Sequence, residues 1–191
     1  MREHIFPETG FLSRTVKEKM LKQKGRVIWL TGLSGSGKTS IAVELEKQLH
    51  ARGLLTQVLD GDNIRAGLNT DLGFSADDRR ENVRRIAEVC LLFVQCGVIV
   101  ICPLVSPSNQ LREMARSIIG NGDFMEVYLN ASLEVCEARD VKGLYAAARS
   151  GTISNFTGLG SSYEIPLKPD LIVDSGTSEI SDCVKEILKR L

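Results

Sequence analysis

Residues 32–39 form a glycine-rich stretch with the residue types and spacing of a phosphate-binding loop. They spell GLSGSGKT, which fits the pattern GxxxxGK[ST]. Glycines allow successive backbone N–H groups to turn inward around a phosphate at the N-terminus of a following helix. The lysine would reach the β- and γ-phosphates, and the threonine hydroxyl would ligate Mg²⁺. The predicted triphosphate-binding residues are Gly32, Leu33, Ser34, Gly35, Ser36, Gly37, Lys38, Thr39 and Ser40.

Two aspartates follow the next apolar stretch, in the sequence LDGDNIR at 59–65. Parallel sheets bind ligands at the carboxyl ends of their strands, so both carboxylates would face the phosphates. Asp62 is the candidate that orients an acceptor hydroxyl and takes its proton, while Asp60 would hold Mg²⁺ through water. Arg65 could pair with an anionic acceptor. Taken alone, these residues fit an ordinary Asp/Gly turn with a helix cap equally well.

Ser75 and Asp78 have the spacing of a capping box, which predicts the start of a long helix at 76–95. Arg79 and Asn82 head its apolar stripe. Because this helix runs antiparallel to the strands, its first two turns lie at the ligand-binding edge. We interpret both residues as acceptor contacts, with Arg79 clamping a phosphate or sulfate. The alternative for Arg79 is a surface salt bridge.

The elements that must position these groups alternate between strand and helix along the chain. Strands are predicted at 26–31, 56–59, 98–102, 124–129 and 171–173. Helices are predicted at 38–51, 76–95, 109–119, 133–139 and from 179 onward, after a polar helix of uncertain extent at 13–24. The fold class is therefore α/β, a three-layer α/β/α fold of the P-loop nucleoside triphosphate hydrolase type with a five-stranded parallel sheet. This context favours a phosphate site over a plain glycine turn.

The composition indicates the number of domains, the kinds of partner and the cellular compartment to expect. The 191 residues, 43% hydrophobic and 25% charged, suit one domain, which we expect at 25–191 after an N-terminal extension at 1–24. The 24 basic and 24 acidic residues cancel, which gives no indication of a nucleic-acid or membrane partner. Five cysteines without a CxxC pair, no signal-like start and no long apolar run lead us to expect a cytoplasmic protein.

The motifs taken together resemble the adenylylsulfate kinase family from about Gly25 to the C-terminus. Besides the stretches above, they are GLNTDLGFS (67–75), DRRENVRR (78–85), CEARDVKGLY (136–145), FTGL (156–159) and YEIP (163–166). The resemblance implies phosphorylation of the 3′-hydroxyl of adenosine 5′-phosphosulfate (APS) by ATP with Mg²⁺. The products would be ADP and 3′-phosphoadenosine 5′-phosphosulfate (PAPS), for sulfate assimilation. A homodimer and a functional link to ATP sulfurylase are also implied.

The resemblance assigns the acceptor to residues of several segments. Arg65, Arg79 and Asn82 would contact its phosphosulfate and ribose, and Phe74 and Phe156 would enclose its adenine. The two phenylalanines could also be lid or core packing. The resemblance places Asp62 at the attacking hydroxyl, which with Lys38 makes it catalytic.

A lid at about 139–163 is also implied by the resemblance. Arg139 would lie against the adenine of ATP and Lys142 would approach the acceptor, with closure excluding water. A solvated loop is the alternative. In the family the serine of a Ser-Pro pair after the third strand lies near the transfer site and is phosphorylatable, and here this is Ser106. We hypothesise direct in-line transfer, in which Ser106 is a third catalytic residue that positions phosphate oxygens without carrying the phosphate. A turn at a helix start is the alternative.

The chain departs from the family pattern at several positions. Val141 stands where a proline is usual, Ser108 and Asn109 stand for a tyrosine and an arginine, and Ala66 stands for a histidine. The usual acidic residues around 160–163 are missing. These departures leave open how tightly the acceptor binds, how the lid moves and whether the acceptor is a related compound. Two rivals remain at this point: a binding module that holds nucleotide without transfer, and a P-loop kinase of another nucleoside or of a carbohydrate.

Overall fold

Five parallel strands form the centre of the computed structural model, which describes residue 6 and residues 8–191. Their order across the sheet is β2-β3-β1-β4-β5. The bounds are Arg26–Thr31 for β1, Thr56–Val58 for β2, Ile99–Pro103 for β3, Phe124–Leu129 for β4 and Leu171–Val173 for β5. The predicted five-stranded parallel sheet is confirmed. The second strand ends one residue earlier than predicted, and the third is shifted by one residue.

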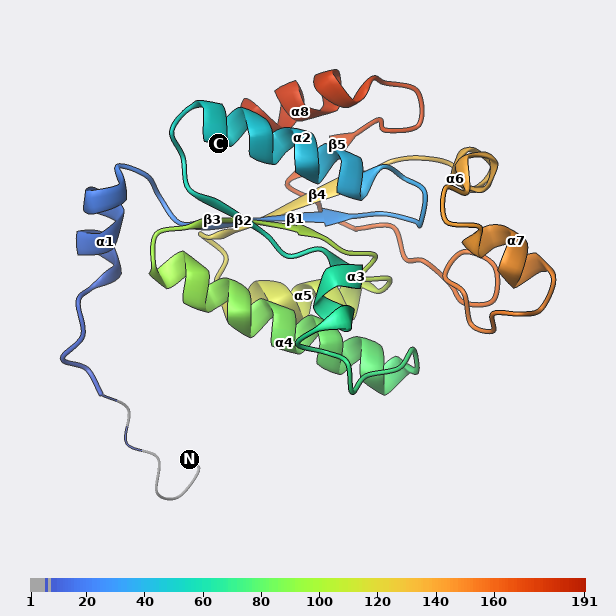
Figure 1. Cartoon of the computed structure of the whole chain (residues 1–191), viewed down its shortest axis with the longest axis horizontal. Coiled ribbons are helices and arrows are strands. Elements are labelled where there is room, and N and C mark those ends of the chain that lie inside the picture. The colour runs from blue at the N-terminus through green and yellow to red at the C-terminus, as the bar shows by residue number, and fades with distance from the viewer. Residues whose placement is uncertain (1–5, 7) are drawn as a thin grey trace.

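Helices cover both faces of this sheet (Figure 1). One face carries α2 (Lys38–Ala51) and α8 (Ile180–Leu188), and the other carries α4 (Ala76–Gln95) and α5 (Asn109–Ile119). Side chains alternate between the faces of a strand, so those of β1 divide between two cores. Trp29 packs with the α4 and α5 side, and Ile28 and Leu30 pack with the α2 and α8 side. Both faces are therefore buried, which confirms the predicted three-layer α/β/α fold.

Two short helices were not predicted from the sequence. They are α3 (Gly61–Ala66) and α7 (Leu144–Arg149), of six residues each. A nearby aspartate satisfies free N–H groups at the start of each: Asp60 accepts from the N–H of Asp62 at 3.0 Å, and Asp140 accepts from that of Tyr145 at 3.0 Å. Helices this short contain too few residues for a periodic apolar pattern. Both lie beside the site described below.

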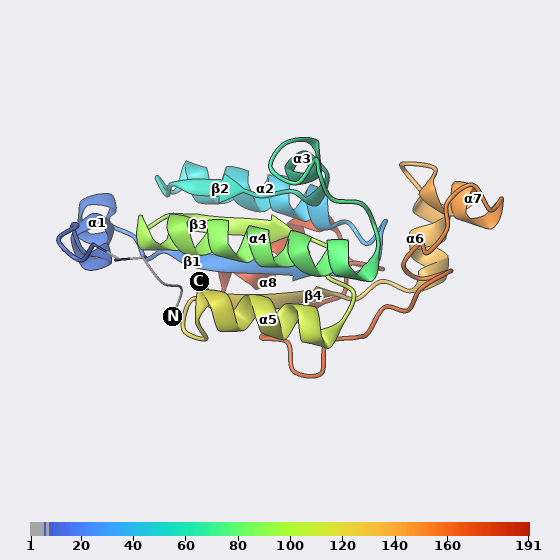
Figure 2. The ribbon, with the colours of Figure 1, turned by 90° about the horizontal axis from the view of Figure 1, so that it is seen from below.

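The first described helix, α1 (Arg14–Leu21), lies at the opposite end of the sheet from α6 (Leu133–Arg139) and α7 (Figures 1 and 2). Arg14 forms an ion pair with Asp123, and the side chain of Gln23 donates to the carbonyl of Gly97 at 2.7 Å. The predicted helix at 13–24 is thus confirmed in a shorter form. Part of the predicted extension at 1–24, and of the start used to judge signal character, lies outside the described residues.

None of the helices in the described part of the chain is long and apolar enough to cross a membrane.

Candidate active site

A cavity of about 780 Å³ opens at the carboxyl ends of the strands. Its walls come from the loop after β1, from α3, from the start of α4, from the loop after β3 and from the segment at 139–163. Of the residues predicted from the sequence, Gly32 and Leu33 do not line it. Those that line it are Ser34, Gly35, Ser36, Gly37, Lys38, Thr39, Ser40, Asp60, Asp62, Arg65, Phe74, Arg79, Asn82, Ser106, Arg139, Lys142 and Phe156.

The glycine-rich loop is shaped by close packing against α6 and α7. Gly35 has a φ of +78°, and a Cβ on this residue would lie 2.6 Å from the carbonyl oxygen of Cys136. Any larger residue would therefore push the loop away from α6. The hydroxyl of Tyr145 donates to the carbonyl of Ser34 at 2.9 Å and holds the loop from the α7 side. Sequence reasoning assigned no role to Tyr145, because this bond joins residues far apart in the chain.

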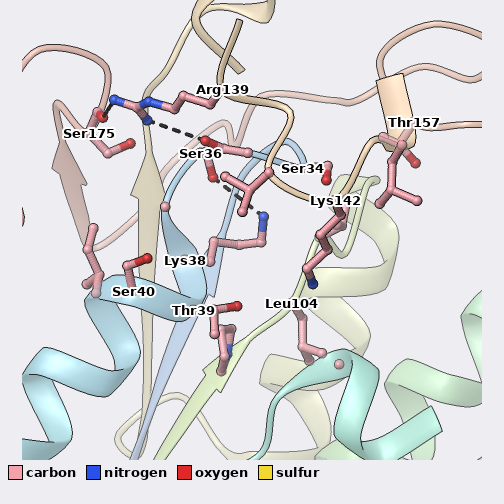
Figure 3. A pocket seen from close by; sticks show the side chains of 18 of the residues that line it. Ser34, Ser36, Lys38, Thr39, Ser40, Leu104, Arg139, Lys142, Thr157 and Ser175 are labelled. Atoms are coloured by element: carbon pink, nitrogen blue, oxygen red, sulfur yellow. Dashed lines mark hydrogen bonds between the residues drawn. The ribbon is translucent and has the colours of Figure 1, made fainter. Parts of the chain in front are cut away.

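Lys38 points its ammonium group back into the loop (Figure 3). The group donates to the carbonyls of Gly32 at 3.0 Å and Leu33 at 2.6 Å, and the residue is only 9% exposed. Burial lowers the pKa of Lys38 to about 8, because the charged form loses its water. A bound triphosphate would replace that lost solvation with negative charge, so this arrangement favours an anionic ligand.

Thr39, Asp60 and Asp62 form a short chain of hydrogen bonds at the cavity wall. The hydroxyl of Thr39 donates to Oδ2 of Asp60 at 3.0 Å, and Oδ1 of Asp60 accepts from the N–H of Asp62 at 3.0 Å. The helix cap considered as an alternative for Asp60 is therefore present, and it leaves Oδ2 facing Thr39. Hydroxyl and carboxylate oxygens side by side suit Mg²⁺, which takes a few protein oxygens and completes its coordination with phosphates and water. No cluster of three or more potential metal-ligating His, Cys, Asp or Glu side chains occurs among the described residues.

Asp62 forms an ion pair with Lys142, and both residues line the cavity. This hydrogen bond raises the pKa of Lys142. The carboxylate of Asp62 is 70% exposed, so it remains open to a ligand entering the cavity. The structure thus joins the predicted acid–base residue directly to the predicted lid.

Two arginines carry positive charge on the cavity wall formed by α3 and α4. The guanidinium of Arg65 lies 4.4 Å from the ring centroid of Phe74, a cation–π contact. Arg79 donates to Thr157 Oγ1 at 2.7 Å and to the carbonyl of Asn155 at 2.8 Å, so it ties α4 to the segment at 139–163. Burial lowers the pKa of both arginines, and the charge of Arg79 further lowers that of Arg65. Two cations held so near each other favour an anionic partner.

The two predicted aromatic residues lie on different walls. Phe74, between α3 and α4, is 65% exposed, whereas Phe156 packs edge-on against Tyr145 with 5.0 Å between ring centroids. Both line the cavity. Phe74 therefore offers an open apolar face, and Phe156 is held by its contact with Tyr145 of α7.

Ser106 is buried beneath the cavity, in the loop after β3, and its hydroxyl is bonded on both sides. It accepts from Trp29 Nε1 at 3.0 Å and donates to Thr31 Oγ1 at 3.1 Å. Its φ of +36° is unusual for a residue with a side chain. Arg112, which is 2% exposed, donates to the carbonyl of Ser106 at 2.6 Å and holds this conformation. The sequence indicated no role for Arg112, because buried arginines are recognised only from their partners.

Arg139 links the phosphate-binding loop to the loop after β5 (Figure 3). Its guanidinium donates to the carbonyls of Gly35 at 3.3 Å and Ser175 at 2.9 Å. The guanidinium is planar and lines the cavity, which suits stacking on a nucleotide base.

Several departures from the expected pattern are structurally compensated. Ser108 caps α5 by accepting from the N–H of Leu111 at 3.3 Å. Asn109 binds the carboxylate of Glu164 through its own N–H at 2.8 Å. Val141 is 89% exposed, so a valine at this position does not disturb the packing of the core.

Comparison with known proteins gives one consistent family. The model of the adenylylsulphate kinase family matches residues 24–174. The adenylyl-sulfate kinase of Phocaeicola vulgatus is 53% identical over 188 residues, which cover 98% of this chain and 92% of that protein. Adenylyl-sulfate kinase 3 of Arabidopsis thaliana is 50% identical over 168 residues, covering 88% of this chain and 81% of that protein. The Mycobacterium tuberculosis APS kinase CysC, solved with AMPPNP and APS, matches with a TM-score of 0.84 and 45% identity, covering 87% of this chain and 97% of that chain.

Proposed function

The chain belongs to the adenylylsulphate kinase family and phosphorylates the 3′-hydroxyl of APS with ATP. We propose the following roles for the residues of the cavity. These roles are supported by one observation. The cavity is lined together by Lys38, Asp62, Arg65 and Arg79. A triphosphate in the glycine loop and an anionic acceptor beside Asp62 would then meet inside it.

On the ATP side, the glycine loop binds the phosphates and Lys38 neutralises charge that develops on the transferring group. Thr39 would hold Mg²⁺ through its hydroxyl, and Asp60 would do so through water. The bound ion would supply further neutralisation of the β- and γ-phosphates. Arg139 stacks on the adenine. The support for these roles is the buried ammonium of Lys38 and the paired oxygens of Thr39 and Asp60.

On the acceptor side, Asp62 orients the 3′-hydroxyl and accepts its proton as the new bond to phosphorus forms. Arg65, Arg79 and Asn82 bind the phosphosulfate and ribose, and Phe74 and Phe156 enclose the adenine. Lys142 leaves Asp62 as the acceptor enters, and then contacts the acceptor itself. This exchange is supported by the ion pair of Lys142 with Asp62 and by the exposure of that carboxylate.

Replacing Arg79 by alanine should raise KM for APS at least tenfold and leave KM for ATP within about twofold, because one charge-assisted contact to the acceptor is lost. Initial rates with each substrate varied separately measure both constants. Arg80→Ala is the matched control, since Arg80 is the next residue of α4 but is exposed and does not line the cavity. Equal losses for ATP and APS would count against the acceptor role of Arg79.

Replacing Ser106 by alanine should lower kcat by less than about tenfold, because we assign direct in-line transfer with no phosphoserine. The support is that the Ser106 hydroxyl already bonds Trp29 and Thr31. The test is single-turnover kinetics of Ser106→Ala with quench and mass analysis of the wild-type protein. Abolished turnover with both affinities intact, together with a chemically competent phosphoserine in the wild type, would show that transfer is indirect.

The activity itself is tested by coupling ADP release to a spectroscopic readout with APS, adenosine, other nucleosides and simple sugars as acceptors. We expect APS to give the highest kcat/KM by a wide margin. Nucleotide binding without ADP release would favour the binding-module alternative. Faster turnover of a sugar or another nucleoside would favour the second rival kinase.

We also propose a single domain at 25–191 with its lid at about 139–163, a homodimer, cytoplasmic localisation and a functional link to ATP sulfurylase. The family match over residues 24–174 supports the domain bounds. In the preceding segment, Arg14 forms an ion pair with Asp123 of the proposed domain. Light scattering measures the oligomeric state, and a monomer at working concentration would refute the dimer.

A further inference from the structure

Asn69 lies between α3 and α4, outside the cavity, and its side chain contacts a residue of the cavity wall. It is completely buried. Its backbone N–H donates to the carbonyl of Ile64 at 2.9 Å, and its carbonyl accepts from the N–H of Leu72 at 3.1 Å. These bonds fix the backbone on both sides. The side-chain Nδ2 of Asn69 then donates to Oδ1 of Asn82 at 3.0 Å.

This contact decides which end of the Asn82 amide faces the cavity. An asparagine side chain has an oxygen that only accepts and a nitrogen that only donates. Because Oδ1 of Asn82 is taken by Asn69, its Nδ2 is left for the cavity that Asn82 lines. Within the part of the chain that the structure describes, Nδ2 of Asn82 has no hydrogen-bond partner.

This arrangement leaves one polar atom of Asn69 without a hydrogen bond. Its own Oδ1 is buried and has no partner among the described residues. A buried carbonyl oxygen without a hydrogen bond destabilises a fold, and a leucine of similar size would fill the same space without that penalty. Among the described residues, the orientation of Asn82 is therefore the one benefit of an amide at position 69 that the contacts reveal.

We propose that Asn69 is a positioning residue, which locks the Asn82 amide so that its N–H₂ group donates to a hydrogen-bond-accepting atom of APS. This inference rests on the proposed acceptor role of Asn82. An unlocked amide could rotate and present its oxygen instead. That oxygen would face the oxygens of an anionic, oxygen-rich acceptor, which repel it.

The test is a double-mutant cycle with Asn69→Leu, Asn82→Ala and the pair together, in which KM for APS and KM for ATP are measured separately. We expect Asn69→Leu to raise KM for APS roughly fivefold to twentyfold and to change KM for ATP less than about twofold. In the Asn82→Ala background, Asn69→Leu should add less than about twofold, because its effect passes through Asn82. Asn63→Leu, at an exposed asparagine of α3 outside the cavity lining, is the control.

The outcomes separate this inference from the proposed function. If Asn82→Ala leaves KM for APS unchanged, the acceptor role of Asn82 fails and the inference fails with it. If Asn82→Ala weakens APS but Asn69→Leu does not, or if the two effects multiply in the double variant, only the positioning role is overturned. Equal rises in both KM values for Asn69→Leu also overturn it. If Asn69→Leu does not fold, Asn69→Ala and Asn69→Ser complete the same cycle.

Discussion

Replacing Lys38 by methionine should lower kcat by about a hundredfold or more, which corresponds to about 2.7 kcal/mol of lost transition-state stabilisation. The ammonium is held by neutral carbonyls of the loop, so its charge is free to act on the transferring phosphoryl group. Methionine keeps most of the stem and removes the charge. Pre-steady-state and steady-state rates of ADP formation at saturating ATP and APS measure the effect.

The stability of the same variant distinguishes a catalytic role of Lys38 from a structural one. Burial disfavours the charged form of Lys38, so removing the charge should leave the thermal midpoint unchanged or higher. Lys47→Met, on the same helix and outside the main cavity, should retain normal kcat. A near-normal kcat in Lys38→Met would refute the catalytic role, and a large loss of stability would mean that the lysine mainly holds the loop.

Replacing Asp62 by alanine should also lower kcat by about a hundredfold or more, since a positioned base commonly contributes this much to proton transfer. Asp62→Asn keeps the shape of the side chain and removes its capacity as a base, so we expect it to lose nearly as much. KM for ATP should change little, because the residue faces the acceptor. Steady-state kinetics of both variants provide the comparison.

Two further variants define what the loss at Asp62 means. Asp77→Ala removes an exposed carboxylate from the first turn of α4, outside the cavity lining, and should retain kcat. Lys142→Ala removes the partner of Asp62 and leaves the carboxylate in place. If Asp62→Asn turned over at a near-normal rate while Lys142→Ala did not, Lys142 rather than the carboxylate would be the important member of the pair.

The parts of this fold that could be predicted are those encoded in local sequence. The strand at 26–31, the glycine loop and the helix at 38–51 are consecutive, and each has its own pattern of apolar residues or glycines. The capping box at Ser75 and Asp78 likewise gave the start of α4, and both of its hydrogen bonds are present. Short helices such as α3 carry no such pattern and were missed.

The parts that could not be predicted depend on contacts between distant residues. Trp29 and Ser106 are 77 positions apart, and no local pattern indicates that a core indole holds a loop at the cavity. Asn69 belongs to a motif that was recognised, yet its partner Asn82 lies on the next helix. The ion pair of Asp62 with Lys142 joins two residues that were each predicted singly. The sequence thus indicated the functional groups, and only the structure showed which of them constrain one another.

Trp29 is the only tryptophan in the chain, and its indole N–H donates to the hydroxyl of a residue that lines the cavity. Indole emission depends on the polarity and hydrogen bonding around the ring. The enzyme therefore contains an intrinsic fluorophore that is hydrogen-bonded to a residue lining its cavity. We expect substrate entry and product departure to change the ultraviolet emission of the native chain, which is measured with no dye attached.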